Sequence, residues 1–350
     1  MITYFGMILI PAIFALVWPR SKNIFLFLII FLLDVILIGY REHIGMDWNN
    51  YLAIHSNMRY LDLGDILFNT EAASNTLFWL SDQYYSGIYT SNLVSAMILM
   101  IGVLVFSART AEPWLSVLAA TPYICIVVGM SATRQAMAVG IVFAVFALWH
   151  EYGLFRKGIA IFAASLFHTS AIFIGGFLIQ DLRLNFAVKL IVGSVVIVAG
   201  VYFLSRAGIY SEQIDFYTES YLSTEGQIAS PGALAHVALV AIPAAIYFFV
   251  RHRIYAMYER SGFLDMSALI CIVLVPTAFV FSTAASRFSI YMQFFPMIFY
   301  PLLVDTFRTE DNRILVRLAV SLLCLGFLFV WLRFANNSFA YLPYRNLLWD

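Results

Sequence analysis

The sequence predicts an all-α polytopic membrane protein with about ten transmembrane helices and one re-entrant helix pair near residues 158–179. Of the 350 residues, 62% are hydrophobic and only 11% are charged, whereas about a quarter of a typical soluble domain is charged. The hydrophobic residues also gather in runs that approach or reach the about 20 residues a helix needs to cross a bilayer. Aromatic residues make up 17% of the chain, which suits belts at the two membrane surfaces.

Ten apolar runs are each expected to cross the bilayer once. They are 2–18, 23–40, 91–107, 113–130, 135–149, 186–204, 233–250, 264–281, 288–304 and 314–333. The first run is not expected to be a cleaved signal peptide, because it lacks a basic start and Trp18-Pro19-Arg20 follows it. We expect residues 1–350 to form a single integral membrane domain, with 41–90 and 205–232 as its sizeable outer loops.

The basic residues divide unequally between two sets of connections. All three lysines and ten of the arginines fall in connections that can lie on one side, which the positive-inside rule makes cytoplasmic. The connections 41–90 and 205–232 hold more acids than arginines and no lysine, so they are expected outside, together with both termini. The arginines left on the outer side are Arg41, Arg59, Arg134, Arg206, Arg287, Arg333 and Arg345.

The run 158–179 does not fit this arrangement as a single span. If it crossed once, the basic stretch Arg251–Arg260 would move to the outer side, against the positive-inside rule. We therefore expect 158–167 and 170–179 to form a re-entrant pair of half-helices, or two short tilted crossings, with a break near His168-Thr169-Ser170. Such a break is tolerated only where protein or water satisfies the backbone, which makes it a candidate site. The alternative is one long helix with a buried histidine.

The densest polar cluster, residues 40–51, begins where the second span leaves the membrane. An arginine such as Arg41 can hold a phosphate through two N–H groups. Asp47 can act as a general base or orient a sugar hydroxyl. Trp48 and Tyr51 can stack on a sugar ring. The structural alternative is an interfacial aromatic belt with a snorkelling arginine.

Two further polar positions interrupt apolar runs. Arg134, followed by Gln135, lies between two closely spaced runs, and an arginine at that depth needs an acid or a ligand as its partner. An ion pair with an acid of segment 41–90 is the structural alternative. His168, at the expected break, could donate a proton to a leaving group or bind phosphate, or could be a hydrogen-bonded structural histidine.

The late part of the chain adds a third polar group on the same predicted face. Arg287 closes the cluster Ser282–Arg287 between two spans, and Tyr291 follows it. A second arginine near the outer surface is what a pyrophosphate ligand would need. The C-terminal tail carries Tyr344 and Arg345, and it can equally be an interfacial anchor.

The remaining titratable groups are isolated. Asp34 lies inside the second span, where an acid is a functional hypothesis by default, and we expect a partner from another helix. Glu71 precedes an apolar run and could be a helix cap, a base or a loop charge. Cys125, Cys271 and Cys324 lie in apolar runs without metal-binding spacing and are expected to be small buried hydrophobes. A net charge of zero gives no nucleic-acid footprint.

Three motifs stand in order along the chain: Arg41-xxx-Gly45-x-Asp47-Trp48-xx-Tyr51, then Arg134-Gln135, then Phe167-His168-Thr169-Ser170-Ala171. The late Arg287 and the tail Tyr341-Leu342-Pro343-Tyr344-Arg345 extend the pattern. Together they resemble the EpsG/Wzy-type bacterial polysaccharide polymerases, which make O-antigen or exopolysaccharide. Each motif is short, and their combination over most of the chain carries the resemblance.

The resemblance implies a glycosyltransferase in the bacterial cytoplasmic (inner) membrane. At its periplasmic face it would join undecaprenyl-pyrophosphate-linked oligosaccharide repeat units. No cofactor and no nucleotide sugar would be needed, because the glycosyl-pyrophosphate bond supplies the energy. The expected partners are the lipid-linked oligosaccharide, membrane lipids and a chain-length regulator protein, with no nucleic acid.

The expected roles of the candidate residues follow from this chemistry. Asp47 would be the base or orient the acceptor, His168 would assist the leaving group, and Glu71 is a further candidate base. Arg41, Arg134 and Arg287 would neutralise the pyrophosphate. The other substrate-binding candidates are Gln135, Trp48, Tyr51, Tyr291, Tyr344 and Arg345. No metal site is expected.

Three other functions stay open from the sequence. An O-antigen ligase would use the same donor and a different acceptor. A flippase or transporter of lipid-linked sugars would have a cavity that opens alternately to both faces, preferably with internal repeats, and we find no repeat. A membrane acyltransferase could use His168 as its base, but no acyl-donor motif is apparent.

Overall fold

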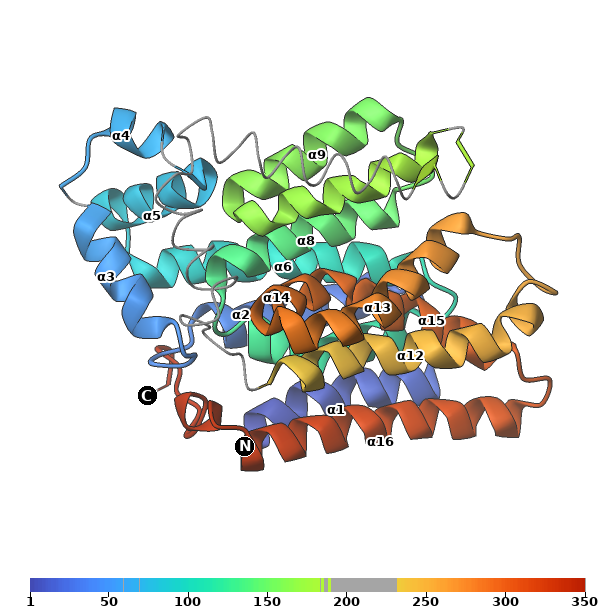
Figure 1. The fold of residues 1–350 in the computed structure, drawn as a ribbon. Helices are drawn as coiled ribbons and strands as arrows, with labels where there is room; N and C mark the ends of the chain where they lie inside the picture. The colour runs from blue at the N-terminus through green and yellow to red at the C-terminus, as the bar shows by residue number, and fades with distance from the viewer. Residues whose placement is uncertain (59, 69, 183, 186–187, 190–231, 350) are drawn as a thin grey trace.

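The computed structural model describes residues 1–350 except 59, 69, 183, 186–187, 190–231 and 350 (Figure 1). Every regular element of the described part is helical, as predicted for an all-α protein. In chain order the elements are α1 (Ile2–Val17), α2 (Ile24–Gly39), α3 (Trp48–Met58), α4 (Leu63–Leu67), α5 (Ala72–Tyr84), α6 (Ile88–Ala108), α7 (Pro113–Ala120), η1 (Thr121–Val128), α8 (Thr133–Ala147), α9 (Leu154–Phe167), η2 (Thr169–Asp181), α12 (Ala233–Ile254), α13 (Gly262–Val280), α14 (Ser282–Met292), α15 (Phe294–Asp305), α16 (Glu310–Phe334) and η3 (Ser338–Ala340).

Four described helices, α6, α12, α13 and α16, are long and apolar enough to cross a membrane. The pair α14 and α15, bent by 49°, counts as a fifth if it is one span. The apolar helices α1, α2 and α8 and the continuous α7–η1 segment are shorter. A 16-residue helix such as α1 is about 24 Å long, less than the about 30 Å of a hydrocarbon core. The chain is thus a multi-pass membrane protein, and the count of ten spans stays a prediction.

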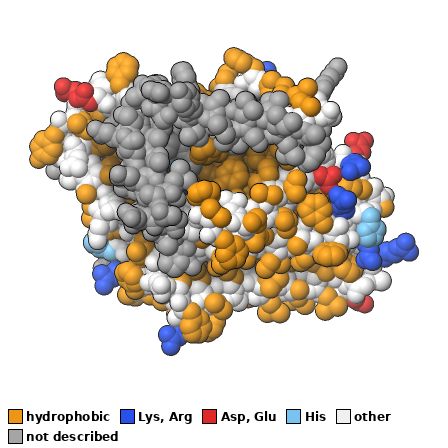
Figure 2. All heavy atoms as spheres, in the orientation of Figure 1, with side chains coloured by type: hydrophobic (Ala, Val, Ile, Leu, Met, Phe, Trp, Pro, Cys, Tyr) orange, Lys and Arg blue, Asp and Glu red, His pale blue; other side chains and the backbone are white. Residues whose placement is uncertain are grey.

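The long apolar helices fall on the predicted runs, whereas most of the run 186–204 and nearly all of the outer loop 205–232 lie outside the described residues. On the face drawn in Figure 2, hydrophobic side chains cover most of the described surface, and charged side chains gather toward its edges. A surface of this kind suits contact with lipid along the middle and with water at the ends.

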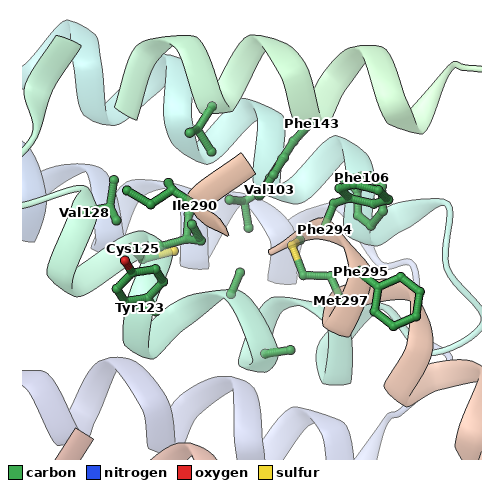
Figure 3. Packing of buried hydrophobic residues seen from close by; sticks show 14 of the residues in the cluster. Val103, Phe106, Tyr123, Cys125, Val128, Phe143, Ile290, Phe294, Phe295 and Met297 are labelled. Carbon is green, nitrogen blue, oxygen red and sulfur yellow. The ribbon is translucent and has the colours of Figure 1, made fainter. Parts of the chain in front are cut away.

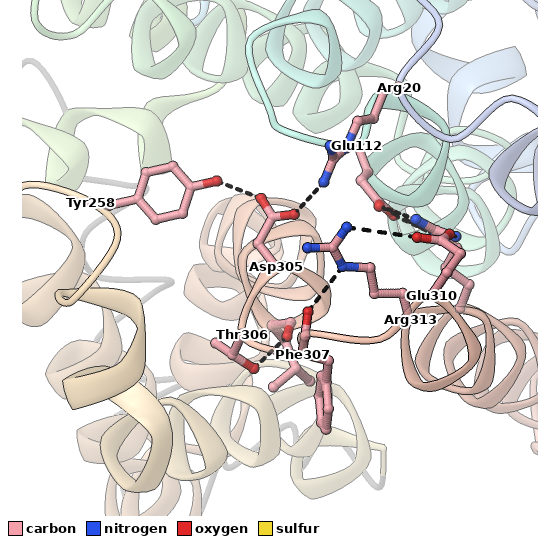
Figure 4. Close-up of polar contacts among 10 residues, drawn as sticks. Arg20, Glu112, Tyr258, Asp305, Thr306, Phe307, Glu310 and Arg313 are labelled. Carbon is pink, nitrogen blue, oxygen red and sulfur yellow. Dashed lines mark hydrogen bonds and ion pairs between the residues drawn. The ribbon is translucent and has the colours of Figure 1, made fainter.

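The connections predicted to be cytoplasmic meet at one end of the bundle. Arg20 donates to Asp305 at 2.7 Å, and Tyr258 donates to the same carboxylate (Figure 4). Arg317, with 3% of its side chain exposed, binds the fully buried carboxylate of Glu112 at 2.6 Å. We call this the basic end. Both termini lie at the opposite end (Figure 1), as the alternation of the spans predicts.

The predicted break at His168 is present. α9 ends at Phe167, His168 is extended with φ −152° and ψ 122°, and η2 starts at Thr169. The two arms pack side by side (Figure 1), and Lys157 near the start of α9 binds Asp181 at the end of η2 at 2.6 Å. The arms are about 21 Å and 26 Å long at the rise of an α-helix and a 3₁₀-helix. The single long helix is therefore excluded.

The centre of the bundle holds α8, which positions the candidate site. Gly102 of α6 and Gly140 of α8 let the two backbones touch, because a Cβ on Gly102 would lie 2.0 Å from the Gly140 carbonyl oxygen. Phe106, Phe143 and Phe294 pack beside this crossing (Figure 3). The three cysteines are free and buried, as predicted.

The outer loop 41–90 contains three helices, α3 to α5, that hydropathy alone did not indicate. They share a small core that includes Trp48, Tyr51, Ile66 and Phe78, and Ile88 at the start of α6 completes it. This small core fixes Glu71, the residue before α5, over the end of the bundle opposite the basic end.

Candidate functional site

A buried ion cluster forms around Glu71. One carboxylate oxygen accepts from Arg134 Nη1 at 2.5 Å, and the other lies 2.5 Å from His168 Nδ1. The second oxygen also accepts from the backbone N–H and the hydroxyl of Thr169, at 3.0 and 3.2 Å. Glu71 is 7% exposed and His168 6%. We call Glu71, Arg134, His168 and Thr169 the Glu71 cluster.

The backbone explains why the carboxylate points this way. Glu71 adopts a left-handed conformation with φ 58° just before α5, and its side chain makes no capping bond to that helix. The cap and the loop charge considered from the sequence are both replaced by an ion pair with Arg134. That pair is the structural alternative foreseen for Arg134, and it also includes the histidine.

The charges of the Glu71 cluster decide its protonation. Burial by itself raises the pKa of Glu71, but the hydrogen bond and charge of His168, with Arg134 and the Thr169 N–H, lower it to about 2. An ionised Glu71 can only accept, so His168 Nδ1 carries the proton in this contact. A carboxylate that holds one imidazole nitrogen leaves the other nitrogen to act on a ligand.

Arg134 connects the Glu71 cluster to the outer helices. It is the second residue of α8, its side chain is 35% exposed, and its backbone N–H donates to the Tyr51 hydroxyl at 3.2 Å. The positive end of the α8 dipole adds to the charge of Arg134 at this point. An anion reaching this end of the bundle would meet both.

Asp47 lies on the same end, in the loop before α3. Its carboxylate accepts from the Ser131 hydroxyl at 3.3 Å. Burial raises the pKa of Asp47, and Ser131, Arg287 and Arg134 act against that rise. A half-buried carboxylate whose pKa is raised by burial is suited to take up a proton from a ligand hydroxyl.

Helix α14 brings the remaining predicted residues to this end. Gln135 donates to the backbone carbonyl of Arg287 at 3.2 Å, and the buried Tyr291 hydroxyl lies 2.9 Å from Ser170 Oγ. Eight candidate residues from distant parts of the chain therefore lie in one region. They are Asp47, Tyr51, Glu71, Arg134, Gln135, His168, Arg287 and Tyr291.

The side chain of Arg41 is buried and hydrogen-bonded to other residues of the protein. It is 1% exposed, and its guanidinium donates to the Ile38 carbonyl at 2.7 Å and to Asn92 and Thr133 at 2.9 Å each. Its backbone forms an antiparallel bridge with Asn346 of the tail. The guanidinium thereby links the end of α2 to α6 and to the start of α8.

Two other candidates have side-chain contacts within the protein, and a third is exposed. Trp48 is 6% exposed and packs against His43 and Tyr89. Tyr344 donates to the Leu37 carbonyl at 2.8 Å, so it anchors the tail. Arg345 is exposed at the surface.

Asp34 differs from its sequence-based prediction, and His236 was not singled out from the sequence. Asp34 is 2% exposed and, within the described part of the chain, its Oδ1 has no hydrogen-bonding partner, so the expected partner from another helix is not found. His236 Nδ1 lies 2.8 Å from Ser286 Oγ, and its ring lies 4.8 Å from that of Tyr123. A histidine near the outer start of an apolar run was the available signal. Among the described residues, no group of three or more His, Cys, Asp or Glu is placed to hold a metal ion.

The fold and this site define a multi-pass membrane protein with a buried ionic cluster at the end opposite its basic loops. The model of the EpsG family matches residues 24–346. The match covers most of the chain, which therefore belongs to the EpsG family, as its motifs indicated, and the family is implicated in exopolysaccharide biosynthesis. Neither the curated proteins nor the solved structures gave a match to the chain.

Proposed function

We propose that the chain is a membrane polysaccharide polymerase, a glycosyltransferase that joins undecaprenyl-pyrophosphate-linked oligosaccharide repeats. Its site would face the outer side of the bacterial cytoplasmic membrane, because it lies opposite the basic end. The observation that carries the proposal is the Glu71–Arg134–His168 cluster next to Asp47 and Arg287, in a member of the EpsG family.

The leaving group is the part of the reaction that needs cations. When the bond between the anomeric carbon and the pyrophosphate oxygen breaks, negative charge develops on that oxygen. A guanidinium has five N–H donors and can serve a carboxylate and a phosphate together. Two arginines would stabilise this charge. One is Arg134, which is oriented by Glu71 and whose side chain is 35% exposed, and the other is Arg287 on α14.

The acceptor sugar needs a base. Its hydroxyl oxygen attacks the anomeric carbon and its proton passes to Asp47, whose raised pKa suits that role. His168, oriented by Glu71 through Nδ1, would hydrogen-bond the leaving pyrophosphate through its other nitrogen. Glu71 would act through His168 and Arg134 and would not itself be the base, because its pKa lies near 2.

The other candidates take lesser places in this proposal. Tyr51, Gln135 and Tyr291 would position Arg134, Arg287 and the His168 break through the contacts described above. Arg41 would hold the scaffold, and Arg345 could meet a long sugar chain from the exposed tail. Membrane lipids and a chain-length regulator protein are further partners in the proposal.

The decisive experiment uses purified protein in vesicles with lipid-linked repeats as the sole sugar source. The wild type should give a ladder of polymers, and Arg134→Ala or Arg287→Ala should reduce polymer formation at least about 100-fold. Arg333→Ala is the matched control, because Arg333 is an exposed arginine that contacts only the Phe334 ring among the interactions described.

Each other outcome has a distinct meaning. If the two arginine variants fold and make long chains at the normal rate, the assignment of the arginines is wrong. Transfer of one repeat to lipid A core or protein, with no ladder, would make the chain a ligase. Movement of the lipid across the bilayer without covalent change would make it a flippase.

A further inference from the structure

A cavity lies at the basic end, away from the Glu71 cluster. It has a volume of about 870 Å³ and opens between the end of α8, the end of η2, the end of α12 and the start of α13. Trp149, which lines it, follows Arg134 by 15 residues, which corresponds to about 22 Å along a helix. The two sites are therefore separate. We call this one the Trp149 cavity.

The wall of the Trp149 cavity on the bundle side is aromatic. Trp149 and Phe263 are 2% and 9% exposed, and their rings lie 5.4 Å apart. Phe248, Met266 and Leu269 continue this apolar lining. A wall of this kind accepts hydrocarbon at the depth where a bilayer meets water.

The remaining lining is charged and balanced in sign. Its described cations are Lys189, Arg251 and Arg260, and its described acids are Asp181, Glu259 and Asp265. Arg251 and Arg260 lie 3.8 and 3.6 Å from the Asp265 carboxylate, farther than a direct hydrogen bond. Both guanidiniums can therefore turn to an anionic oxygen without breaking a short contact.

One buried donor in this wall is unsatisfied. Gln180 lines the cavity, and its buried Nε2 has no hydrogen-bond acceptor in the described part of the chain. A buried donor without an acceptor costs free energy, so such a group commonly marks the place of a ligand or water. Because this Nε2 is covered by protein, the Gln180 amide would have to turn toward the cavity for an anionic oxygen there to accept from it.

We propose that the Trp149 cavity binds the headgroup of a zwitterionic phospholipid that carries a phosphate and a primary ammonium. The phosphate would lie against Arg251, Arg260 and the Gln180 amide. The ammonium would donate to Glu259, an exposed acid on the rim, and the acyl chains would follow Phe248 and Leu269. Asp181 is already paired with Lys157, but the exposed acid Glu259 beside the cations favours this class over a purely anionic headgroup.

The test measures lipid retention by native mass spectrometry of the purified full chain. Phosphatidylethanolamine, phosphatidylcholine and phosphatidylglycerol with identical acyl chains are titrated separately. Choline has no N–H to donate and glycerol has no positive charge, so phosphatidylethanolamine should bind at least about tenfold more tightly, the effect of one charge-assisted hydrogen bond. Equal binding of the three lipids, or tightest binding of phosphatidylglycerol, overturns the proposal.

Two sets of variants test which residues bind the phosphate and which residue binds the ammonium. Arg251→Gln with Arg260→Gln should weaken phosphatidylethanolamine at least about tenfold, and Glu259→Gln should remove its advantage over phosphatidylglycerol. Arg253→Gln is the control, because Arg253 is exposed on α12 and does not line the cavity. An equal loss in the control overturns the site. Free phosphoethanolamine should compete only at far higher concentration, and competition at equal concentration would mean a soluble phosphomonoester ligand instead.

Discussion

The Glu71 carboxylate lies 2.5 Å from His168 Nδ1, although 97 residues separate them in the sequence. The same oxygen accepts the Thr169 N–H at 3.0 Å, at the start of η2. A helix break inside a membrane protein exposes backbone groups that must find partners. Glu71 provides one partner from the outer loop, so a single acid holds both the break and the histidine ring.

Removal of the Glu71 charge should destabilise the protein at neutral pH. Glu71→Gln leaves Arg134 and His168 without their anion, and breaking a buried ion pair typically costs about 3–5 kcal/mol. We expect the lower part of this range, because the Arg134 side chain is 35% exposed. The free energy of unfolding, measured in detergent at pH 7, checks the value.

The sign of the pH dependence follows from the lowered pKa of Glu71. Its folded-state pKa is about 2 against 4.5 for the ordinary group, so its contribution to stability is complete above about pH 4.5 and is lost as the pH falls toward 2. The difference in stability between wild type and Glu71→Gln should shrink over this window. A difference that grows on acidification would contradict the assignment.

Substitution of Gly45 should displace the tail from the outer end. Gly45 has φ +99°, and an added Cβ would lie 2.1 Å from the Met130 carbonyl oxygen. Its N–H also donates to the Ala340 carbonyl at 2.9 Å. Gly45→Ala should cost at least about 1–3 kcal/mol from backbone strain alone, read as a lower melting temperature. Gly153→Ala, with φ −70° and no atom within 4 Å of the new Cβ, should leave the melting temperature nearly unchanged.

Hydropathy and charge predicted the parts of the fold that depend on the bilayer. The apolar runs that the structure describes are helical, and the basic loops meet at one end, because both follow from the transfer of side chains between water and lipid. The break at His168 was also predictable, since the alternative placed Arg251–Arg260 on the wrong side. The helices α3 to α5 were missed because they pack around a small core that includes Trp48 and Phe78 and contain no long apolar run.

The residues of the candidate site were singled out from the sequence, but the contacts between them were not. Arg134, His168 and Glu71 were each singled out, yet their convergence depends on how α5 packs against α6 and α9. Arg41 shows the opposite case, because its motif suggested a ligand and the fold surrounds it with Asn92 and Thr133. Short motifs identify unusual residues, and only the packing of distant helices decides which of them face one another.

Arg41 therefore has a test that separates scaffold from ligand binding. Arg41→Met leaves the buried Ile38 carbonyl without its donor, while Asn92 Oδ1 keeps the hydrogen bond from Thr133, so the change should cost about 1–3 kcal/mol. Melting temperature and polymer yield should fall together, whereas Arg333→Ala on the surface should change neither. A variant that melts like the wild type but makes no polymer would restore Arg41 to the substrate site.

Asp47 should control the acidic side of the pH–rate profile of the proposed polymerase. Burial raises its pKa, so the base becomes protonated and the rate falls as the pH is lowered through that raised pKa. Asp47→Asn should reduce polymerisation about 10²–10⁴-fold and remove the acidic limb, while Asp47→Glu should retain a shifted limb. Initial rates with lipid-linked repeats between pH 4 and 8, on variants with wild-type melting temperatures, check this. An acidic limb that persists unchanged in Asp47→Asn would assign the base to another residue, with His168 as the next to replace.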